Sequence, residues 1–211
     1  MIITQTNPPN LSPPGTPTHI SLEEYRLLEE TAQERHEYRH GEIIAMPGGS
    51  AVHSRIAVNI STFLNFVLRD TPFQTYNSDL RIWIPQFNHG TYADVFIIEG
   101  EPQFNENRTD EVINPLLIIE VLSPSTENYD RGDKFRKYRS LPSFCEYLLV
   151  SQTEPYIEHY QKLEPGTHTP WQWQVYDQLE NSILLHSLNL ELPLLEIYRR
   201  LNFTPIPNPN P

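Results

Sequence analysis

The stretch "LLIIEVLSPS", Leu116 to Ser125, places one carboxylate, Glu120, inside an apolar run. Successive side chains of a β-strand point to opposite faces, so Ile118, Glu120 and Leu122 share one face while Ile119 and Val121 share the other. Apolar residues on both faces predict a central strand that is covered on both sides. An unpaired buried carboxylate is costly, so Glu120 is expected to meet a cation or to lie where the sheet opens into a cleft.

A second acid has a similar position. Asp94 begins the apolar run "DVFII" and is expected to share a strand face with Phe96 and Ile98. Two carboxylates that converge from neighbouring strands, with a lysine nearby, can hold a divalent cation, orient a water and offset charge on a phosphate. The alternative is structural: Asp94 caps a turn, and Glu120 pairs with a basic residue only to satisfy its charge.

Length and composition indicate one domain. The chain has 211 residues, of which 38% are hydrophobic, and a chain of this size can bury one core. Its prolines concentrate at the ends, which predicts proline-rich tails at 1–18 and 202–211 around a single domain at 19–201. The net charge of -12 argues against nonspecific binding of nucleic acid over the whole surface.

The pattern along the chain predicts a mixed α/β fold. Ser21 and Glu24 form a capping box for a helix that ends near Glu30. A hairpin turning at His40-Gly41 follows, and helical spacing continues from Ala51 to about Arg69. Three strands are then expected within 73–85, 91–100 and 115–123, followed by a helix at 130–140, strands within 145–151, 156–161 and 171–177, and a short helix from about Pro193.

Several classes of protein are excluded or disfavoured. The N-terminus lacks the basic and apolar regions of a signal peptide, and no apolar window could span a membrane, so a cytoplasmic protein is expected. The single cysteine, Cys145, suits a small core residue better than a nucleophile. The histidines form neither HExxH nor a Cys/His cluster, and no Walker, GxGxxG or GxSxG motif is present.

These residues carry a resemblance to a known family. The order of Asp94, Glu120 and a following helix resembles the PD-(D/E)-x-K nuclease superfamily, and the chain is more closely similar to the Uma-two family of proposed restriction endonucleases. The most specific piece is "NPLLIIEVLSPSTENYDRGDKFRKYRSLPSFCEYLLV", with "HEYRHGEI", "SDLRIWI" and "YADVFII" as further matching pieces. The resemblance covers about Ser21 to Tyr160. It implies a restriction-endonuclease-like core with a central mixed sheet, flanking helices and an N-terminal hairpin extension.

The resemblance also implies a magnesium site, in which Mn²⁺ is an alternative ion. Its metal ligands would be Asp94, Glu120 and the backbone carbonyl of Val121. Two positions depart from the pattern, because Ala93 replaces the proline before the aspartate and Leu122 stands where the short motif expects a lysine. Lys134 is the candidate to supply the missing ammonium from the next helix, as the third catalytic residue.

Smaller roles follow from the same pattern. Tyr138 would share a helix face with Lys134, and Glu37 and His53 are further auxiliary candidates, each with an ordinary structural role as the alternative. Asp79 is expected to be a turn or strand-end residue. The cluster "DRGDKFRKYRS" is either a solvated helix face or a local basic patch, and its predicted DNA contacts are Arg131, Arg136 and Lys137.

The sequence thus predicts a metal-dependent endodeoxyribonuclease that acts on DNA, without a membrane partner. Strands after residue 145 are candidates for a homodimer interface. One alternative is an inactive member of the nuclease fold that only binds DNA or protein, since Leu122 replaces the expected lysine. Another alternative is a glycoside hydrolase that uses Asp94 and Glu120 as its acid and base, although that function leaves Lys134 and the basic helix unexplained.

Overall fold

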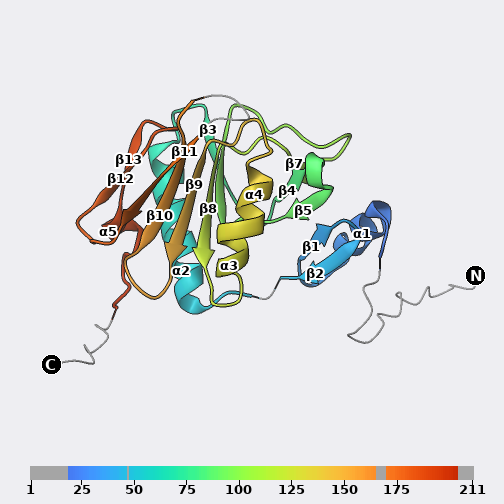
Figure 1. The fold of residues 1–211 in the computed structure, drawn as a ribbon, viewed down its shortest axis with the longest axis horizontal. Coiled ribbons are helices and arrows are strands. Elements are labelled where there is room, and N and C mark those ends of the chain that lie inside the picture. Colours follow the sequence, from blue (N-terminus) through green and yellow to red (C-terminus); the bar gives the residue numbers. More distant parts are fainter. Residues whose placement is uncertain (1–18, 47, 165–169, 204–211) are drawn as a thin grey trace, which may run out of the picture.

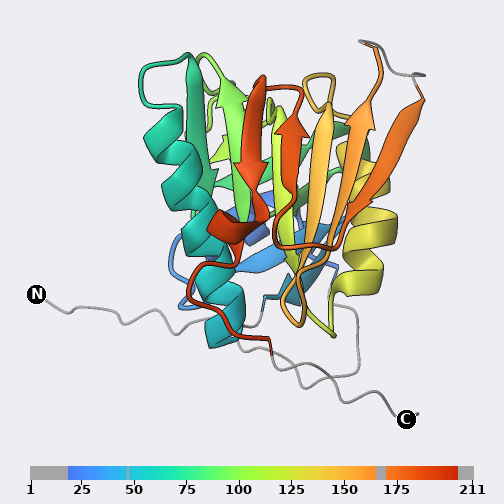
Figure 2. The same cartoon turned by 90° about the vertical axis from the view of Figure 1, so that its left-hand side faces the viewer.

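A six-stranded mixed sheet forms the centre of the molecule (Figures 1 and 2). The computed structural model describes residues 19–46, 48–164 and 170–203, so the predicted tails lie outside the described residues except at 202–203. The strand order is β11-β10-β9-β8-β6-β3, and β8 runs parallel to β9 and antiparallel to β6. The strands are β3 (Phe73–Asn77), β6 (Val95–Glu99), β8 (Leu117–Leu122), β9 (Glu146–Ser151), β10 (Ile157–Lys162) and β11 (Trp171–Tyr176).

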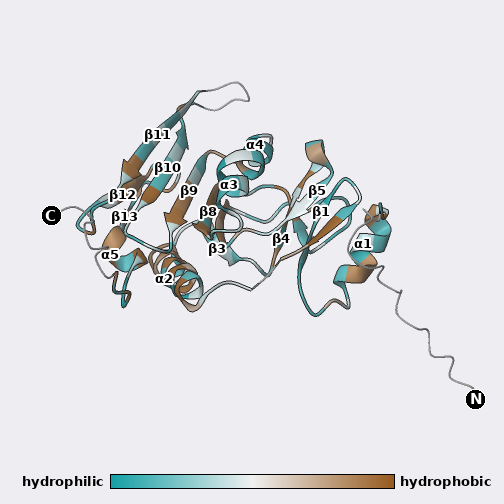
Figure 3. Cartoon of the chain, turned by 60° about the horizontal axis from the view of Figure 1, so that its bottom comes forward, coloured by the Kyte–Doolittle hydropathy of each residue, from teal (hydrophilic) through white to brown (hydrophobic). Residues whose placement is uncertain are grey.

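Helices and a hairpin cover the two faces of this sheet. One face packs against α2 (Ala51–Val67), the hairpin of β12 (Ser182–Leu185) and β13 (Leu190–Pro193), and α5 (Leu194–Ile197). The other packs against one helical segment made of α3 (Glu127–Tyr129), a π-helical turn η2 (Asp130–Lys134) and α4 (Phe135–Tyr138). Figure 2 shows α2 and α4 on opposite sides of the sheet, and Figure 3 shows the hydrophobic residues of α2 and of the middle strands.

The alternation in β8 agrees with the predicted two-sided strand. Ile119 and Val121 pack in the core under α2, whereas Ile118 and Leu122 pack in the core under α4. Glu120 is buried on the α4 side. The mixed α/β fold with a central sheet and flanking helices is therefore confirmed, and the carboxylate does lie in the interior.

A second, smaller sheet carries the N-terminal part of the chain. Its order is β2-β1-β5-β4-β7, with β1 (His36–Arg39), β2 (Glu42–Ala45), β4 (Arg81–Ile84), β5 (His89–Thr91) and β7 (Glu111–Val112), and a 3-10 turn η1 (Pro85–Phe87) joins β4 to β5. The predicted hairpin turn is present, because His40 and Gly41 have φ angles of 49° and 96°. Helix α1 (Leu22–Glu29) starts with the predicted capping box of Ser21 and Glu24.

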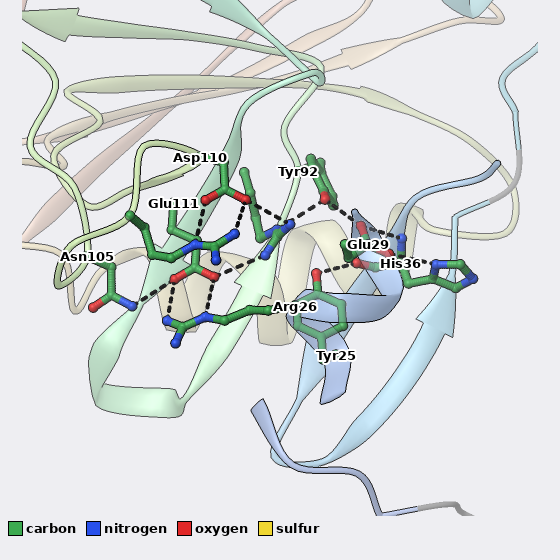
Figure 4. A network of polar contacts seen from close by, with 10 residues as sticks. Tyr25, Arg26, Glu29, His36, Tyr92, Asn105, Asp110 and Glu111 are labelled. Atoms are coloured by element: carbon green, nitrogen blue, oxygen red, sulfur yellow. Dashed lines mark hydrogen bonds and ion pairs between the residues drawn. The ribbon is translucent and has the colours of Figure 1, made fainter. Parts of the chain in front are cut away.

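A buried polar network fastens α1 to this smaller sheet (Figure 4). Glu111 is fully buried and accepts hydrogen bonds from Arg26 at 2.7 and 2.9 Å and from Arg81 at 3.0 Å. The Arg81 guanidinium also lies 4.8 Å from the ring centroid of Tyr25 on α1. Because a buried charge must be paired, the network fixes the helix against β4 and β7.

Some predicted elements were wrong. The run 73–85 is not one strand, because a turn at 78–80 breaks it into β3 and β4, which belong to different sheets. Asp79 lies in this turn, as predicted, and its backbone N–H donates to Asn77 Oδ1 at 3.1 Å. The run 91–100 is likewise divided between β5 and β6, and β7, β12 and β13 were not predicted. In the part of the chain that the structure describes, no helix has the length and hydropathy needed to cross a bilayer.

Candidate active site

Asp94 and Glu120 lie side by side at one end of the main sheet. Val95 pairs with Ile119 in the antiparallel ladder of β6 and β8, so the preceding Asp94 and the following Glu120 are neighbours across the two strands. Asp94 Oδ2 accepts a hydrogen bond from the backbone N–H of Val121 at 2.7 Å. Both carboxylates line the same cleft, which is the convergence expected of a two-carboxylate site.

Lys134 reaches this pair from the helical segment. Its Nζ lies 2.8 Å from Glu120 Oε1, 3.5 Å from Asp130 Oδ1 and 3.9 Å from Glu37 Oε1, and it donates to the backbone carbonyl of Tyr92 at 3.1 Å. Lys134 is buried, so its charge depends on these acceptors. One ammonium therefore connects three carboxylates that come from β1, β8 and the helix.

The π-helical turn accounts for part of this arrangement. Turns of this kind widen a helix by one residue and are common at functional sites. Here the turn runs from Asp130 to Lys134, and both end residues are buried although they carry charge. One turn later, the hydroxyl of the fully buried Tyr138 donates to Glu120 Oε1 at 3.0 Å. Lys134 and Tyr138 thus contact the same oxygen of Glu120.

The buried environment changes the protonation of the pair. Burial raises the pKa of Glu120 and attraction to Lys134 opposes this rise, while the carboxylates of Asp130 and Asp94 add to it, so that the pKa of Glu120 lies at about 8. Burial would lower the pKa of Lys134, but attraction to Glu120 and Asp130 holds that pKa well above its usual value. Lys134 is consequently a fixed cation, and Glu120 is a carboxylate whose ionised form needs a positive partner.

Glu37 is held from several sides. It accepts hydrogen bonds from Arg39 at 2.5 and 3.0 Å, from Thr91 at 2.5 Å and from the hydroxyl of Tyr129 at 3.2 Å. Burial opposes its ionisation, but attraction to Lys134 and then to other cations lowers the pKa of Glu37. Glu37 therefore acts on Lys134 as a carboxylate, at the edge where the smaller sheet meets the helix.

His53 contacts the other carboxylate. It lies in the first turn of α2, where its backbone N–H donates to the capping Ser50 Oγ at 3.0 Å. Its Nε2 lies 3.3 Å from Asp94 Oδ2, and hydrogen bonding to Asp94 raises the pKa of His53. The imidazole can therefore hold a proton at Nε2 beside the cleft.

The predicted DNA contacts lie elsewhere. Arg131 pairs with Glu127 and Glu158 at 2.7 and 2.8 Å, and Arg136 and Lys137 both pair with Asp133, at 2.6 and 2.8 Å. None of these three cations is among the residues that line the cleft. Lys137 is also buried, whereas Arg136 and Arg139 are exposed, so only part of the basic run forms a solvated face. The structure places Arg35 and Arg39 in the cleft wall instead.

Sequence reasoning missed Asp130, Tyr92 and Tyr129. Asp130 stands four residues before Lys134, a spacing that brings side chains together on a helix, so it had a detectable signal. Tyr92 contributes only its backbone carbonyl, and Tyr129 joins Glu37 to the buried His89 at 3.2 Å on each side. Burial lowers the pKa of His89 to about 3. These contacts depend on how the two sheets meet, which no local pattern records.

The donor set fits a hard divalent cation. Asp94, Glu120 and the Val121 carbonyl offer oxygen atoms, which Mg²⁺ and Mn²⁺ prefer. Among residues 19–46, 48–164 and 170–203, no three His, Cys, Asp or Glu side chains gather into a metal-binding cluster. Mg²⁺ commonly uses one or two carboxylates and completes its shell with water and substrate phosphate. Two adjacent carboxylates in an open cleft meet that requirement.

The volume of the cleft indicates which size of substrate it can hold. The cleft has a volume of about 1910 Å³, above the roughly 300–1,000 Å³ of small-molecule sites, so it suits an extended substrate.

Cys145 is half-buried and does not line the cleft, and its Sγ lies 3.6 Å from the Leu116 carbonyl oxygen. Burial raises the pKa of this thiol to about 12, which argues against a nucleophile.

Comparisons with known proteins show which family the chain belongs to. The family model "Uma2: Putative restriction endonuclease" matches residues 22–195. "Uncharacterized protein slr1290" of Synechocystis is 41% identical over 192 residues, covering 91% of this chain and 98% of the relative. "Uncharacterized protein sll1609" of the same organism is 41% identical over 144 residues, covering 68% of this chain and 81% of the relative.

A solved structure supports the fold. The crystal structure of "a putative nuclease belonging to DUF820" from Anabaena variabilis has a TM-score of 0.67 to this chain. It is 19% identical in sequence, and the match covers 84% of this chain and 97% of the other. The family model covers most of the chain. The protein therefore belongs to the Uma2 family, whose model is described as "Putative restriction endonuclease".

Proposed function

We propose that the protein is a metal-dependent endodeoxyribonuclease that hydrolyses phosphodiester bonds of DNA. The observation that carries this proposal is the contact of Lys134 Nζ with Glu120 Oε1 at 2.8 Å, beside Asp94 on the neighbouring strand. Two carboxylates and an ammonium in one cleft are the groups that metal-assisted phosphoryl chemistry requires. Membership of a family described as restriction endonucleases supports the same reaction class.

Each side chain has a role in this reaction. Asp94 and Glu120, with the Val121 carbonyl, would hold Mg²⁺ or Mn²⁺, which supplies an activated water and neutralises phosphate charge when bound. The Lys134 ammonium stabilises negative charge that develops on the phosphate. The Val121 N–H fixes the orientation of Asp94, and His53 Nε2 can give a proton to the leaving oxygen.

The acidic chain must also attract an anionic substrate. Arg35 and Arg39 line the cleft, and the Arg35 side chain is 46% exposed, paired there with Asp79. Exchanging such an exposed ion pair for a phosphate contact costs little, because surface pairs contribute about 0–1 kcal/mol. We therefore expect Arg35 to contact the DNA backbone more directly than Arg131, Arg136 and Lys137 do.

Nicking of supercoiled plasmid tests the proposal. The purified protein is expected to nick plasmid with Mg²⁺ or Mn²⁺ and to be inactive in EDTA. Asp94→Asn should abolish nicking, whereas Asp79→Asn, an exposed acid of the same cleft wall, should not. Nicking that persists in EDTA or in Asp94→Asn would refute the mechanism.

One observation favours a second candidate, a nuclease fold that binds DNA without cutting it. Leu122 occupies the position of the motif lysine and is buried in the core under α4, so that position carries no charge. If Lys134 does not replace it, the cleft would bind DNA only. Salt-sensitive DNA affinity without nicking in either metal, by a folded protein, would support this candidate.

A further inference from the structure

The face of β10 and β11 that points toward α4 carries aromatic side chains away from the cleft. Tyr160 pairs with Trp173 and Lys162 pairs with Trp171 across these strands, so the four side chains share one face. Trp171 packs against Phe135 of α4, with ring centroids 5.2 Å apart. Trp173 lies farther out and is 56% exposed. None of these residues lines the cleft.

The rings of Phe135, Tyr160 and Trp173 form a row that runs from the core to the surface. The Phe135 centroid lies 4.9 Å from that of Tyr160, which lies 6.5 Å from that of Trp173. Trp173 is unusual in being half-exposed, since large aromatic side chains are mostly buried in folded proteins. In the described chain, Phe66 on α2 is the other exposed aromatic residue among the large hydrophobic side chains.

Two cations flank these rings. Most Lys and Arg side chains of the described residues pair with a carboxylate, whereas Arg55, Arg139, Lys162 and Arg200 have no such ion pair there. Two of these four, Arg139 and Lys162, lie beside the rings. The Arg139 guanidinium lies 5.0 Å from the Phe135 ring centroid, and Lys162 lies opposite Trp171. Phe135 is buried and Trp171 is half-buried, but both belong to the row of rings that ends at the exposed Trp173. In a chain with net charge -12, cations without a carboxylate partner beside such a row indicate an anionic ligand that also stacks.

Nucleic acid with unpaired bases has both properties. Bases stack on aromatic side chains when they are not paired in a duplex, and the adjacent phosphates bind Lys and Arg. A second copy of the chain fits less well, because a two-fold interface would bring the cations Arg139 and Lys162 of one copy close to the same cations of the other. The surface of Tyr160, Lys162, Trp173 and Arg139 is called the aromatic-basic surface below.

We propose that the aromatic-basic surface binds single-stranded DNA, by stacking bases on Trp173 and Tyr160 and by binding phosphates with Arg139 and Lys162. This inference rests on the proposed function only in the choice of DNA as the ligand, since binding at the aromatic-basic surface requires neither a metal nor the cleft carboxylates. It would hold a single-stranded segment outside the cleft that Lys134 lines.

The test measures binding of a fluorescein-labelled oligothymidine of about 20 nucleotides to the full chain in EDTA, by fluorescence anisotropy. Trp173→Ala should weaken binding about tenfold, as expected for loss of base stacking. Arg139→Gln and Lys162→Gln should each lower the slope of log affinity against log salt by about 0.7. The matched control is Phe66→Ala, which removes an exposed ring that also contacts an arginine, Arg69 at 4.5 Å, and should leave binding unchanged.

Two results would overturn the inference. One is equal affinity of wild type and Trp173→Ala, with circular dichroism showing that both are folded. The other is a dimer in light scattering that Trp173→Ala converts to a monomer, which would make the surface a subunit interface. Plasmid nicking separates this inference from the proposed function. If the protein does not nick plasmid but binds oligothymidine through Trp173, the binding inference is supported and the proposed nuclease function is refuted.

Discussion

Lys134 Nζ lies 2.8 Å from Glu120 Oε1, so the helix after β8 supplies the ammonium that the strand itself lacks. Leu122, two residues after Glu120, points into the same core and cannot carry charge there without a partner. Asp130 and Glu37 also lie within 4 Å of the ammonium. The position of the lysine is therefore set by three carboxylates and a π-helical turn, and not by the strand that carries Glu120.

This contact predicts that Lys134→Met lowers metal-dependent nicking by about 10²–10³, the usual effect of removing one charge-stabilising group from an active site. The control is Lys137→Met, since Lys137 is also buried on the same helical segment but pairs with Asp133 outside the cleft. Its nicking should stay within about threefold of wild type. Single-turnover nicking rates compare the two, and equal rates for Lys134→Met and wild type would remove Lys134 from the mechanism.

Tyr138→Phe tests how Glu120 is held. It removes the hydroxyl that donates to Glu120 Oε1 at 3.0 Å. Above the Glu120 pKa of about 8 this is a hydrogen bond to a buried charged group, which contributes about 1.5–3 kcal/mol to the free energy of unfolding. Tyr76→Phe is the control, because the Tyr76 hydroxyl donates to the neutral Gln74 side chain at 2.8 Å in a half-buried place, which contributes about 0.5–1.5 kcal/mol. Urea unfolding measures both. A smaller loss for Tyr138→Phe than for Tyr76→Phe would contradict the assigned contact.

The continuous apolar run "LLIIEVL" was enough to predict the two-sided strand and the buried carboxylate, because a strand with apolar residues on both faces must be covered on both sides. The break at Ser78 was not predictable from the same rule. Apolar and β-branched residues continue on both sides of it, and only the assembled fold shows that β3 and β4 enter different sheets.

The sequence likewise identified some residues of the candidate site and missed others. Asp94, Glu120 and Lys134 were identified from strand position, charge and family pattern, and they lie together in the cleft. The basic run could not be interpreted by charge alone, since every cation in it looks alike in the sequence. Burial of Lys137 and pairing of Arg131 with Glu158 on β10 depend on packing between elements, which periodicity does not describe.

Glu111 predicts an acid-sensitive part of the stability. Burial opposes its ionisation, but hydrogen bonds from Arg26 and Asn105 lower the pKa of Glu111 below its ordinary value. A carboxyl with a lowered folded pKa stabilises the fold above its unfolded pKa of about 4.5, and this contribution is lost as the pH falls through the folded pKa. Glu111→Gln should therefore cost about 3 kcal/mol at pH 7, and less at each step below about pH 4.5.

The control for that network is Glu106→Gln (Figure 4 shows the network around Glu111). Glu106 contacts the same Arg26 at 3.2 Å, but its side chain is 65% exposed, so its loss should cost less than about 1 kcal/mol. Urea unfolding of both variants from pH 7 to pH 3 gives the comparison. A cost of Glu111→Gln that is constant over this range would show that the charge of Glu111 is not what stabilises the network.

Gly132 lies inside the π-helical turn, and its replacement should stabilise the protein. A Cβ at Gly132 would meet no atom within 4 Å, and the residue has no positive φ, so Gly132→Ala removes the entropy cost of a helical glycine without strain. The free energy of unfolding should rise by about 0.4–1 kcal/mol, with nicking unchanged because Lys134 keeps its place. Gly41→Ala is the control with the opposite sign, since Gly41 has φ of 96° and its Cβ would collide with His19. Thermal and urea unfolding measure both, and a destabilised Gly132→Ala would mean that the turn needs a backbone freedom that only glycine provides.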